Sequence, residues 1–80
     1  MKIQVTNLTQ EPVHLGDFYT TVRGGGSIEV ERSAGELSGL KTVHKAVQEG
    51  LVAVALTATS ETELAFVEVP PGWGLPKVGN

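Results

Sequence analysis

The fold is decided by the stretch SAGELSGLKTVHKAVQEGLVAVALTA, residues 33–58, which we interpret as one capped helix followed directly by one buried strand. Ser33 and Glu36 have the spacing of a capping box, in which the hydroxyl accepts from the Glu36 N–H and the carboxylate accepts from the Ser33 N–H. The predicted helix covers residues 34–49. Gly50 follows where a left-handed residue would close the helix.

The predicted helix is amphipathic. Its apolar residues recur at the helical period and fall within an arc of about 120°; they are Leu37, Leu40, Val43 and Val47. Polar residues fall on the opposite side, namely Lys41, Thr42, Lys45, Gln48 and Glu49. We therefore expect one face of this helix to pack on the core.

Residues 51–56, LVAVAL, are apolar at every position. They are too few to cross a membrane, and a strand of this kind is typical of the middle of a sheet that is covered on both faces. One helix covers one face. The other cover must come from the chain's own hairpin, from its C-terminal tail or from a neighbouring subunit.

The rest of the chain predicts further strands at residues 2–6, 13–15, 18–22, 27–31 and 64–69. Three successive glycines, Gly24 to Gly26, require a loop, so we expect residues 18–22 and 28–31 to form a hairpin. Residues 57–63 are expected to be a loop that returns residues 64–69 antiparallel to residues 51–56. The predicted fold class is α+β, a small and mostly antiparallel sheet of five or six strands with one helix.

From Pro70 onward the composition changes, which predicts a domain over residues 1–69 and an extended arm over residues 70–80. Prolines exclude a helix or a central strand here. The arm either folds back so that Trp73 covers the sheet, or docks on a neighbouring subunit, or stays disordered. For the docking alternative, the predicted contact residues are Trp73, Leu75, Val78, Pro70 and Pro71.

Size and charge limit the classes of function. Eighty residues make one domain with a thin stability margin, and no cysteine is present to cross-link it. Association with other chains is therefore favoured. The net charge of −3 and the scattered Lys and Arg residues argue against direct nucleic-acid binding. The N-terminus lacks the apolar region of a signal peptide, and we expect no membrane partner.

No set of residues has the pattern of a catalytic, metal or cofactor site. The only imidazoles, His14 and His44, have no metal-site spacing and are interpreted as ordinary, partly buried residues. The alternating pairs Glu29/Glu31 and Glu61/Glu63 are typical of a solvated strand face. The glycine run lacks the Gly-Lys-Ser/Thr ending of a phosphate loop. We expect no enzymatic activity, no cofactor and no small-molecule ligand.

The layout of the chain resembles the small accessory proteins encoded among the structural genes of tailed bacteriophages. The resemblance lies in Val5-Thr6-Asn7 at the end of the first strand, in Glu11-Pro12-Val13, in the strand Gly25-Gly26-Ser27-Ile28-Glu29-Val30 and in the helix end Glu49-Gly50-Leu51-Val52-Ala53-Val54. It covers about residues 3–56. It implies a virion structural protein that is present in many copies.

The expected function is therefore that of a non-enzymatic subunit of a phage particle: a capsid decoration or minor capsid protein, or a neck or tail component. Its partners would be other virion subunits, and its location the virion, assembled in the host cytoplasm. The alternative is a small cytoplasmic module that binds or regulates one partner protein.

Overall fold

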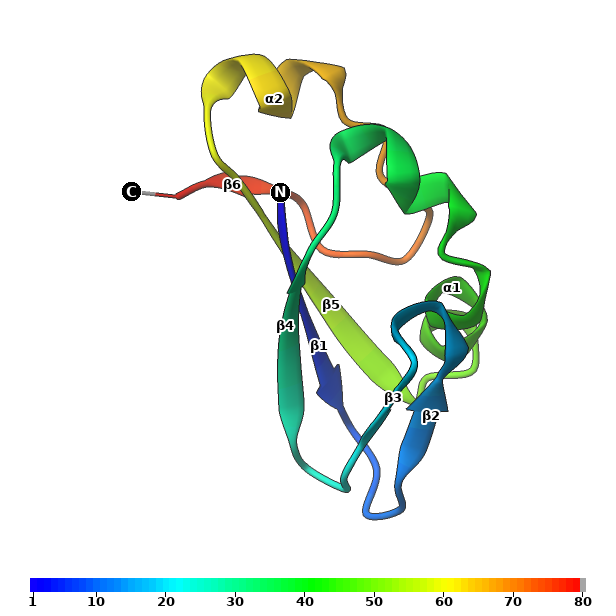
Figure 1. The fold of residues 1–80 in the computed structure, drawn as a ribbon. Helices are drawn as coiled ribbons and strands as arrows, with labels where there is room; N and C mark the ends of the chain where they lie inside the picture. The colour runs from blue at the N-terminus through cyan, green and yellow to red at the C-terminus, as the bar shows by residue number, and fades with distance from the viewer. Residues whose placement is uncertain (80) are drawn as a thin grey trace.

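Residues 1–79 are described by a computed structural model, and Asn80, the end of the predicted arm, lies outside the described residues. The strands are β1 (Lys2–Asn7), β2 (Val13–Leu15), β3 (Thr20–Val22), β4 (Ser27–Glu31), β5 (Val52–Ala58) and β6 (Lys77–Val78). The helices are two 3-10 helices, η1 (Gly16–Phe18) and η2 (Ala34–Gly39), and two α-helices, α1 (Lys41–Gln48) and α2 (Glu61–Phe66). The predicted α+β class, with six strands, is confirmed (Figure 1).

The larger sheet is built on β1. Its strand order is β4-β1-β5-β6, and β1 pairs antiparallel with both β4 and β5. Ile3 faces Val30 on one side and Leu56 on the other. The β5–β6 pair is parallel and joins only two residues of each strand. The β2–β3 hairpin forms a separate sheet of two strands.

One face of this sheet carries the core. Along β1 and β5 the buried and accessible positions alternate, and the buried residues pack with residues from η2, α1 and the hairpin. Ala53 and Ala55 of β5 are exposed on the other face. The expectation that β5 is covered on both faces is therefore wrong. The apolar run allowed it, but the positions of the run that are fully exposed, Ala53 and Ala55, hold only alanine, whose methyl group loses little by meeting water.

The predicted helix over residues 34–49 is divided in two. Residues 34–39 form η2, and α1 begins at Lys41 after Leu40, whose φ and ψ of −83° and 67° interrupt the helix. Ser38-Gly39 precedes this break, and such small residues are frequent at kinks. Both segments still direct their apolar residues to the core: Leu37, Leu40 and Val43 are buried and Val47 is half-buried.

The two ends of α1 are closed in different ways. At its N-terminus, Leu40 offers no side-chain cap, and the Val43 N–H instead donates to a carboxylate oxygen of Asp17 at 3.0 Å. At its C-terminus, Gly50 has a φ of 75°, as predicted. The Gly50 N–H donates to Val47 and the Leu51 N–H to Ala46, which is the Schellman pattern.

Two strand pairings predicted from the sequence are wrong. Residues 18–22 do not pair with residues 28–31, because β3 pairs with β2 and β4 pairs with β1. The stretch 64–69 is not a strand: α2 occupies residues 61–66, and β6 takes the place beside β5. Residues 57–63 are not all loop either, since β5 continues to Ala58 and α2 begins at Glu61.

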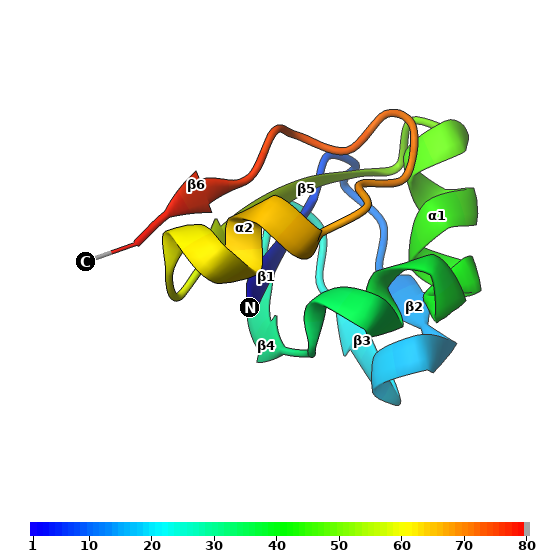
Figure 2. The ribbon, with the colours of Figure 1, turned by 90° about the horizontal axis from the view of Figure 1, so that it is seen from above.

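The C-terminal segment folds back along β5 (Figure 2). The Gly74 N–H donates to the Val54 carbonyl at 3.1 Å, and the Gly79 N–H donates to the Ala58 carbonyl at 2.9 Å. Trp73 is 6% exposed and belongs to the core. Of the alternatives for this arm, the structure therefore shows the one in which Trp73 covers the chain's own sheet.

Asn7 is a buried polar side chain at the end of β1, 1% exposed. Its amide donates to the carbonyls of Glu11 and Val22 at 2.7 and 3.0 Å. Its oxygen accepts from the N–H and the hydroxyl of Thr9, each at 2.8 Å. All four hydrogen bonds that an amide commonly makes are therefore formed.

The loops next to Asn7 are held close together. The Gly25 N–H donates to the Thr9 carbonyl at 2.9 Å. Gly24 lies so near Gln10 that a Cβ at this position would collide with the Gln10 backbone. The glycine run is thus a loop, as predicted, and its composition follows from this close approach.

Replacing Asn7 by Ala should lower the free energy of unfolding by about 2–4 kcal/mol, because the buried groups that it satisfies lose their partners. Urea unfolding measures this change. Gln4→Ala is the matched control, since Gln4 is exposed on the same strand, and it should change stability by less than about 0.5 kcal/mol. Equal effects of the two substitutions would show that the Asn7 hydrogen bonds carry no special weight.

Candidate interaction surface

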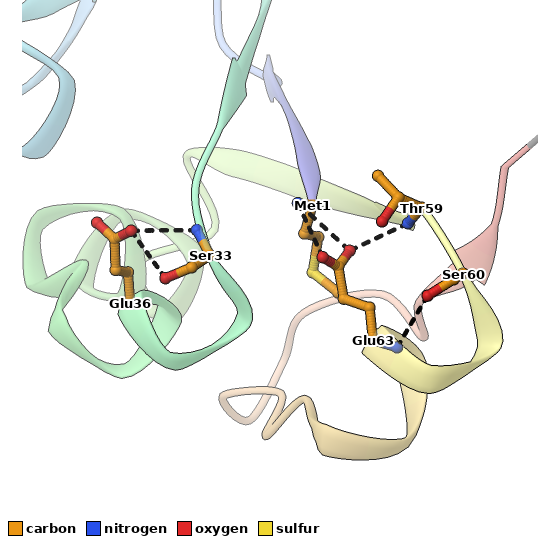
Figure 3. Close-up of polar contacts among 6 residues, drawn as sticks. All are labelled: Met1, Ser33, Glu36, Thr59, Ser60 and Glu63. Atoms are coloured by element: carbon orange, nitrogen blue, oxygen red, sulfur yellow. Dashed lines mark hydrogen bonds and ion pairs between the residues drawn. The ribbon is translucent and has the colours of Figure 1, made fainter.

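Two serine–glutamate pairs fix the N-terminal ends of η2 and α2 (Figure 3). At η2, the predicted capping box is present: the Glu36 carboxylate accepts from the Ser33 N–H at 3.1 Å and from its hydroxyl at 2.8 Å. At α2, the Glu63 N–H donates to the Ser60 hydroxyl at 3.2 Å. The Glu63 carboxylate accepts from the Thr59 N–H at 3.0 Å and pairs with the Met1 ammonium at 3.3 Å.

These contacts favour the ionised carboxylates. The hydroxyl and then the backbone N–H of Ser33 lower the pKa of Glu36 below its usual value. The Thr59 N–H, more than the Met1 ammonium, lowers the pKa of Glu63. Each carboxylate is therefore more acidic in the folded chain than in the unfolded one, and the folded state is stabilised while both remain ionised.

The double variant Glu36→Gln/Glu63→Gln should flatten the loss of stability in acid. A depressed folded-state pKa gives stability that is present above the ordinary value of 4.5 and is lost as the pH falls through the folded value. The measurement is urea unfolding over a series of pH values from neutral to acid. Glu49→Gln serves as the control, because Glu49 is exposed on the last turn of α1. If the double variant loses as much stability between neutral and acid pH as the native chain does, these two carboxylates do not cause that loss.

The predicted contact residues of the arm have different positions. Trp73 is buried in the core of its own chain, so its predicted role as an exposed anchor for a neighbour is contradicted by the structure. Leu75 and Val78 are 86% and 42% exposed. Pro70 is half-buried and Pro71 is exposed. The structure thus separates one core residue from four that a partner could reach.

Trp73→Ala should lower the free energy of unfolding by about 3–5 kcal/mol, because it empties a large buried volume. Thermal and urea unfolding of the isolated chain measure the loss. Leu75→Ala, two residues away and exposed, should stay within about 0.5 kcal/mol of the native chain. A Trp73→Ala chain that melts like the Leu75→Ala chain would mean that the tail does not dock on its own domain.

A continuous, hollowed surface surrounds η2. One hollow is lined by Tyr19, Arg32, Gly35 and Ser38 among others, a second by Gly35, Ser38, Phe66 and Glu68. A third, of about 330 Å³, is lined by Ser38, His44, Glu68, Pro70 and Pro71 among others. Ser38 lines all three hollows. Figure 2 shows η2 between α2, which ends at Phe66, and η1, which is followed by Tyr19. We name this region, with Tyr19, Phe66, Pro70, Pro71 and residues 34–39, the η2 surface.

Small residues form the centre of the η2 surface. Nothing lies within 4 Å of the positions that a Cβ would occupy on Gly35 or Gly39. Another chain could therefore approach the backbone of η2 closely. Large apolar side chains stand beside it, since Phe66 is 77% exposed and Tyr19 is 93% exposed. Small residues flanked by exposed aromatic side chains are suited to contact with a second protein.

Tyr19 has an unusual backbone conformation. Its φ is 51°, and it is the one residue other than glycine with a positive φ in the described part of the chain. Its N–H donates to the Gly16 carbonyl at 3.2 Å, which closes η1. The left-handed region is unfavourable for a bulky side chain, yet this ring makes almost no contact within its own chain. Strained residues of this kind are enriched at functional sites.

The chemistry of the remaining polar residues is limited. His14 is exposed, not partly buried as expected, and its Nδ1 lies 3.0 Å from the Thr21 hydroxyl. His44 is half-buried in the third hollow, and its Nδ1 has no hydrogen-bond partner among residues 1–79. No group of three or more potential metal ligands occurs in that part of the chain. None of the helices formed by residues 1–79 is long and apolar enough to cross a membrane.

Two features of this surface were not predicted from the sequence, and only one of them has a signal there. Ser60 and Glu63 repeat the spacing of Ser33 and Glu36, which predicts the start of a helix and not the middle of a loop. That signal would have placed Phe66 in a helix and not in a strand. The conformation of Tyr19 has no comparable signal, because tyrosine itself disfavours it.

The comparisons with known proteins give no relative: no protein-family model matches the chain, and no curated protein or solved structure matches it either. The case for a function therefore rests on the residues themselves.

Proposed function

We propose that this chain is a non-enzymatic structural subunit of a tailed-phage particle, and that it works by contact between its η2 surface and neighbouring subunits. The observation that carries the proposal is Tyr19, an aromatic ring that is 93% exposed on a backbone of positive φ. The conformation is unfavourable for tyrosine, and burial within its own chain does not compensate for it. A contact with another protein supplies a reason for it.

The surroundings of Tyr19 support a protein partner. Phe66 and Pro71 are exposed on the same surface, and Gly35 and Gly39 leave room above the backbone. Aromatic anchors account for much of the binding energy at protein interfaces. Several large apolar groups exposed around one element are also a liability for a free monomer, which favours a state in which a partner covers them.

The assignment to a phage particle is supported by the resemblance in layout over about residues 3–56. Its elements have clear places in the fold: Asn7 ends β1, residues 27–31 form β4, and Gly50 closes α1 before β5. The particle parts to which the proposal extends are the capsid decoration or minor capsid proteins and the neck and tail components.

The test of a particle subunit is copy number. Particles purified on a gradient from host cells that carry this sequence should contain the chain in many stoichiometric copies, measured by quantitative mass spectrometry. Cryo-electron microscopy should then show it in a symmetric array. A chain that is absent from the particles but binds one cytoplasmic protein would instead be the small binding or regulatory module.

Tyr19→Asn should separate contact from folding. Asparagine accepts the left-handed conformation more readily than tyrosine, so the melting temperature should stay the same or rise. Incorporation into particles should fall about tenfold or more, as expected for the loss of an aromatic anchor. Leu8→Asn is the control, because Leu8 is also exposed but does not line the η2 surface. Unchanged incorporation of Tyr19→Asn would remove the η2 surface from the proposal.

A further inference from the structure

The larger sheet has a free edge at β4. In the order β4-β1-β5-β6, β4 pairs only with β1 and is the outer strand in Figure 1. The β1–β4 pair has one further backbone hydrogen bond at each end. The Asn7 N–H donates to the Gly26 carbonyl at one end, and the Arg32 N–H donates to the Met1 carbonyl at the other. In an antiparallel pair the bonded residues alternate, so Ile28 and Val30 turn their backbone groups to β1.

The backbone N–H and C=O groups of Ser27, Glu29 and Glu31 therefore point away from the sheet. No strand among residues 1–79 pairs with that side of β4. The Glu31 carbonyl accepts from the Arg32 side chain at 2.7 Å, a contact that an added strand would replace. A row of donors and acceptors spaced along an extended strand is a template for one further strand. This geometry specifies the backbone of the ligand, which must be extended.

The side chains of β4 indicate what the added strand carries. Ile28 and Val30 are only half-buried although they pack against the core. A hollow of about 500 Å³ lies beside Ile28, lined by Thr21, Val22 and Ile28 among others. An apolar side chain of an added strand opposite Ile28 would enter this hollow, and one opposite Val30 would cover the exposed part of that side chain.

On the other face of β4, Glu29 and Glu31 are exposed. Glu29 lies opposite Gln4 and Glu31 lies opposite Lys2 in the register with β1, but within residues 1–79 no salt bridge involves either carboxylate. Basic residues at alternate positions of an added strand would lie across from both, where opposite charges stabilise a pair. Arg23 lines the hollow at the other end of β4, so an acidic residue fits there.

A second copy of this chain is a poor occupant of the edge. Antiparallel pairing of β4 with itself over all five residues places Glu29 opposite Glu29, and a shift of two residues one way places Glu29 opposite Glu31. A shift of two residues the other way places Glu29 opposite Ser27, but it leaves only residues 27–29 of β4 paired. Like charges directly opposite one another are destabilising. The charge pattern therefore favours a different protein.

We propose that β4 binds an extended segment of a neighbouring protein as an added antiparallel strand. The segment carries Lys or Arg opposite Glu29 and Glu31, apolar residues between and beside them, and an acidic residue near Arg23. The inference rests on the proposed function for the source of the segment, a neighbouring virion subunit. It concerns a surface separate from the η2 surface.

The experiment uses the full chain, labelled with ¹⁵N, and a capped peptide of the sequence Lys-Val-Lys-Val-Glu. Binding at millimolar peptide should slow hydrogen exchange at the amides of Ser27, Glu29 and Glu31. The amides of Ile28 and Val30 already bond to β1 and should change little. The charge-reversed peptide Glu-Val-Glu-Val-Lys should bind about tenfold more weakly, because it places like charges opposite one another.

Glu29→Pro is the decisive variant. It removes an outward N–H and leaves the bonds to β1, and proline is tolerated on an edge strand at such a position. It should weaken binding of the basic peptide about tenfold through the lost hydrogen bond and charge. Glu29→Ala is the matched control, which keeps the N–H and should weaken binding less. Should Glu29→Pro fail to fold, the double variant Glu29→Lys/Glu31→Lys should reverse the preference between the two peptides.

Several results would overturn the proposal. These are the absence of protection with either peptide, equal binding of both peptides, and protection of Ile28 and Val30 in place of their neighbours. Protection that appears without peptide and grows with chain concentration would identify a second copy as the occupant. If the peptide binds but purified particles contain no chain, the strand-binding site on β4 stands and the assignment to a phage particle falls. If Glu29→Pro is fully incorporated into particles, the assignment to a particle stands and the role of the β4 edge in assembly falls.

Discussion

The side chain of Asn7 is the interaction on which the architecture most depends. β1 is the centre of the larger sheet, and its last residue must release the chain into the loop that leads to the β2–β3 hairpin. Asn7 joins that loop at Glu11 to β3 at Val22 through one amide. Because both carbonyls are held by the same buried group, the hairpin has one position relative to the sheet. Losing that amide would leave the buried Val22 carbonyl without its Asn7 partner, whereas the Glu11 carbonyl would keep the Thr9 hydroxyl as a donor.

Local signals in the sequence predicted local structure well. The Ser33–Glu36 box, the left-handed Gly50 and the apolar stripe from Leu37 to Val47 are all present, since each depends only on neighbours within one or two turns. The division of the helix at Leu40 was missed because α1 takes its N-terminal cap from Asp17, which is remote in sequence. A partner so far away has no local pattern, and only the tertiary fold brings it to the helix end.

Pairing and packing over long distances were the parts that could not be predicted. Residues 18–22 and 28–31 are close in sequence, which favours a hairpin, but β1 offered β4 a longer partner with Ile3 and Val5 against its apolar positions. The apolar and β-branched residues of 64–69 suggested a strand, and the Ser60 cap outweighed them. Likewise, Trp73 has the composition of an interface anchor. It enters the core because a small domain has few other large side chains with which to fill it.

The two edges of the larger sheet differ, and this asymmetry is the structural basis of the proposal that β4 binds a further strand. Beside β5, the chain's own tail covers the edge: Trp73 fills the core and the N–H groups of Gly74 and Gly79 use free carbonyls of β5. On the outer side of β4, no strand formed by residues 1–79 pairs with it, and two exposed glutamates lie on this strand. Charges on an open edge discourage unselective pairing. They also make the edge selective, because the groups that repel a second copy of β4 attract a strand of opposite charge. The strand addition that we propose requires both properties, because the edge has to stay unpaired in the free chain and then pair selectively with one partner.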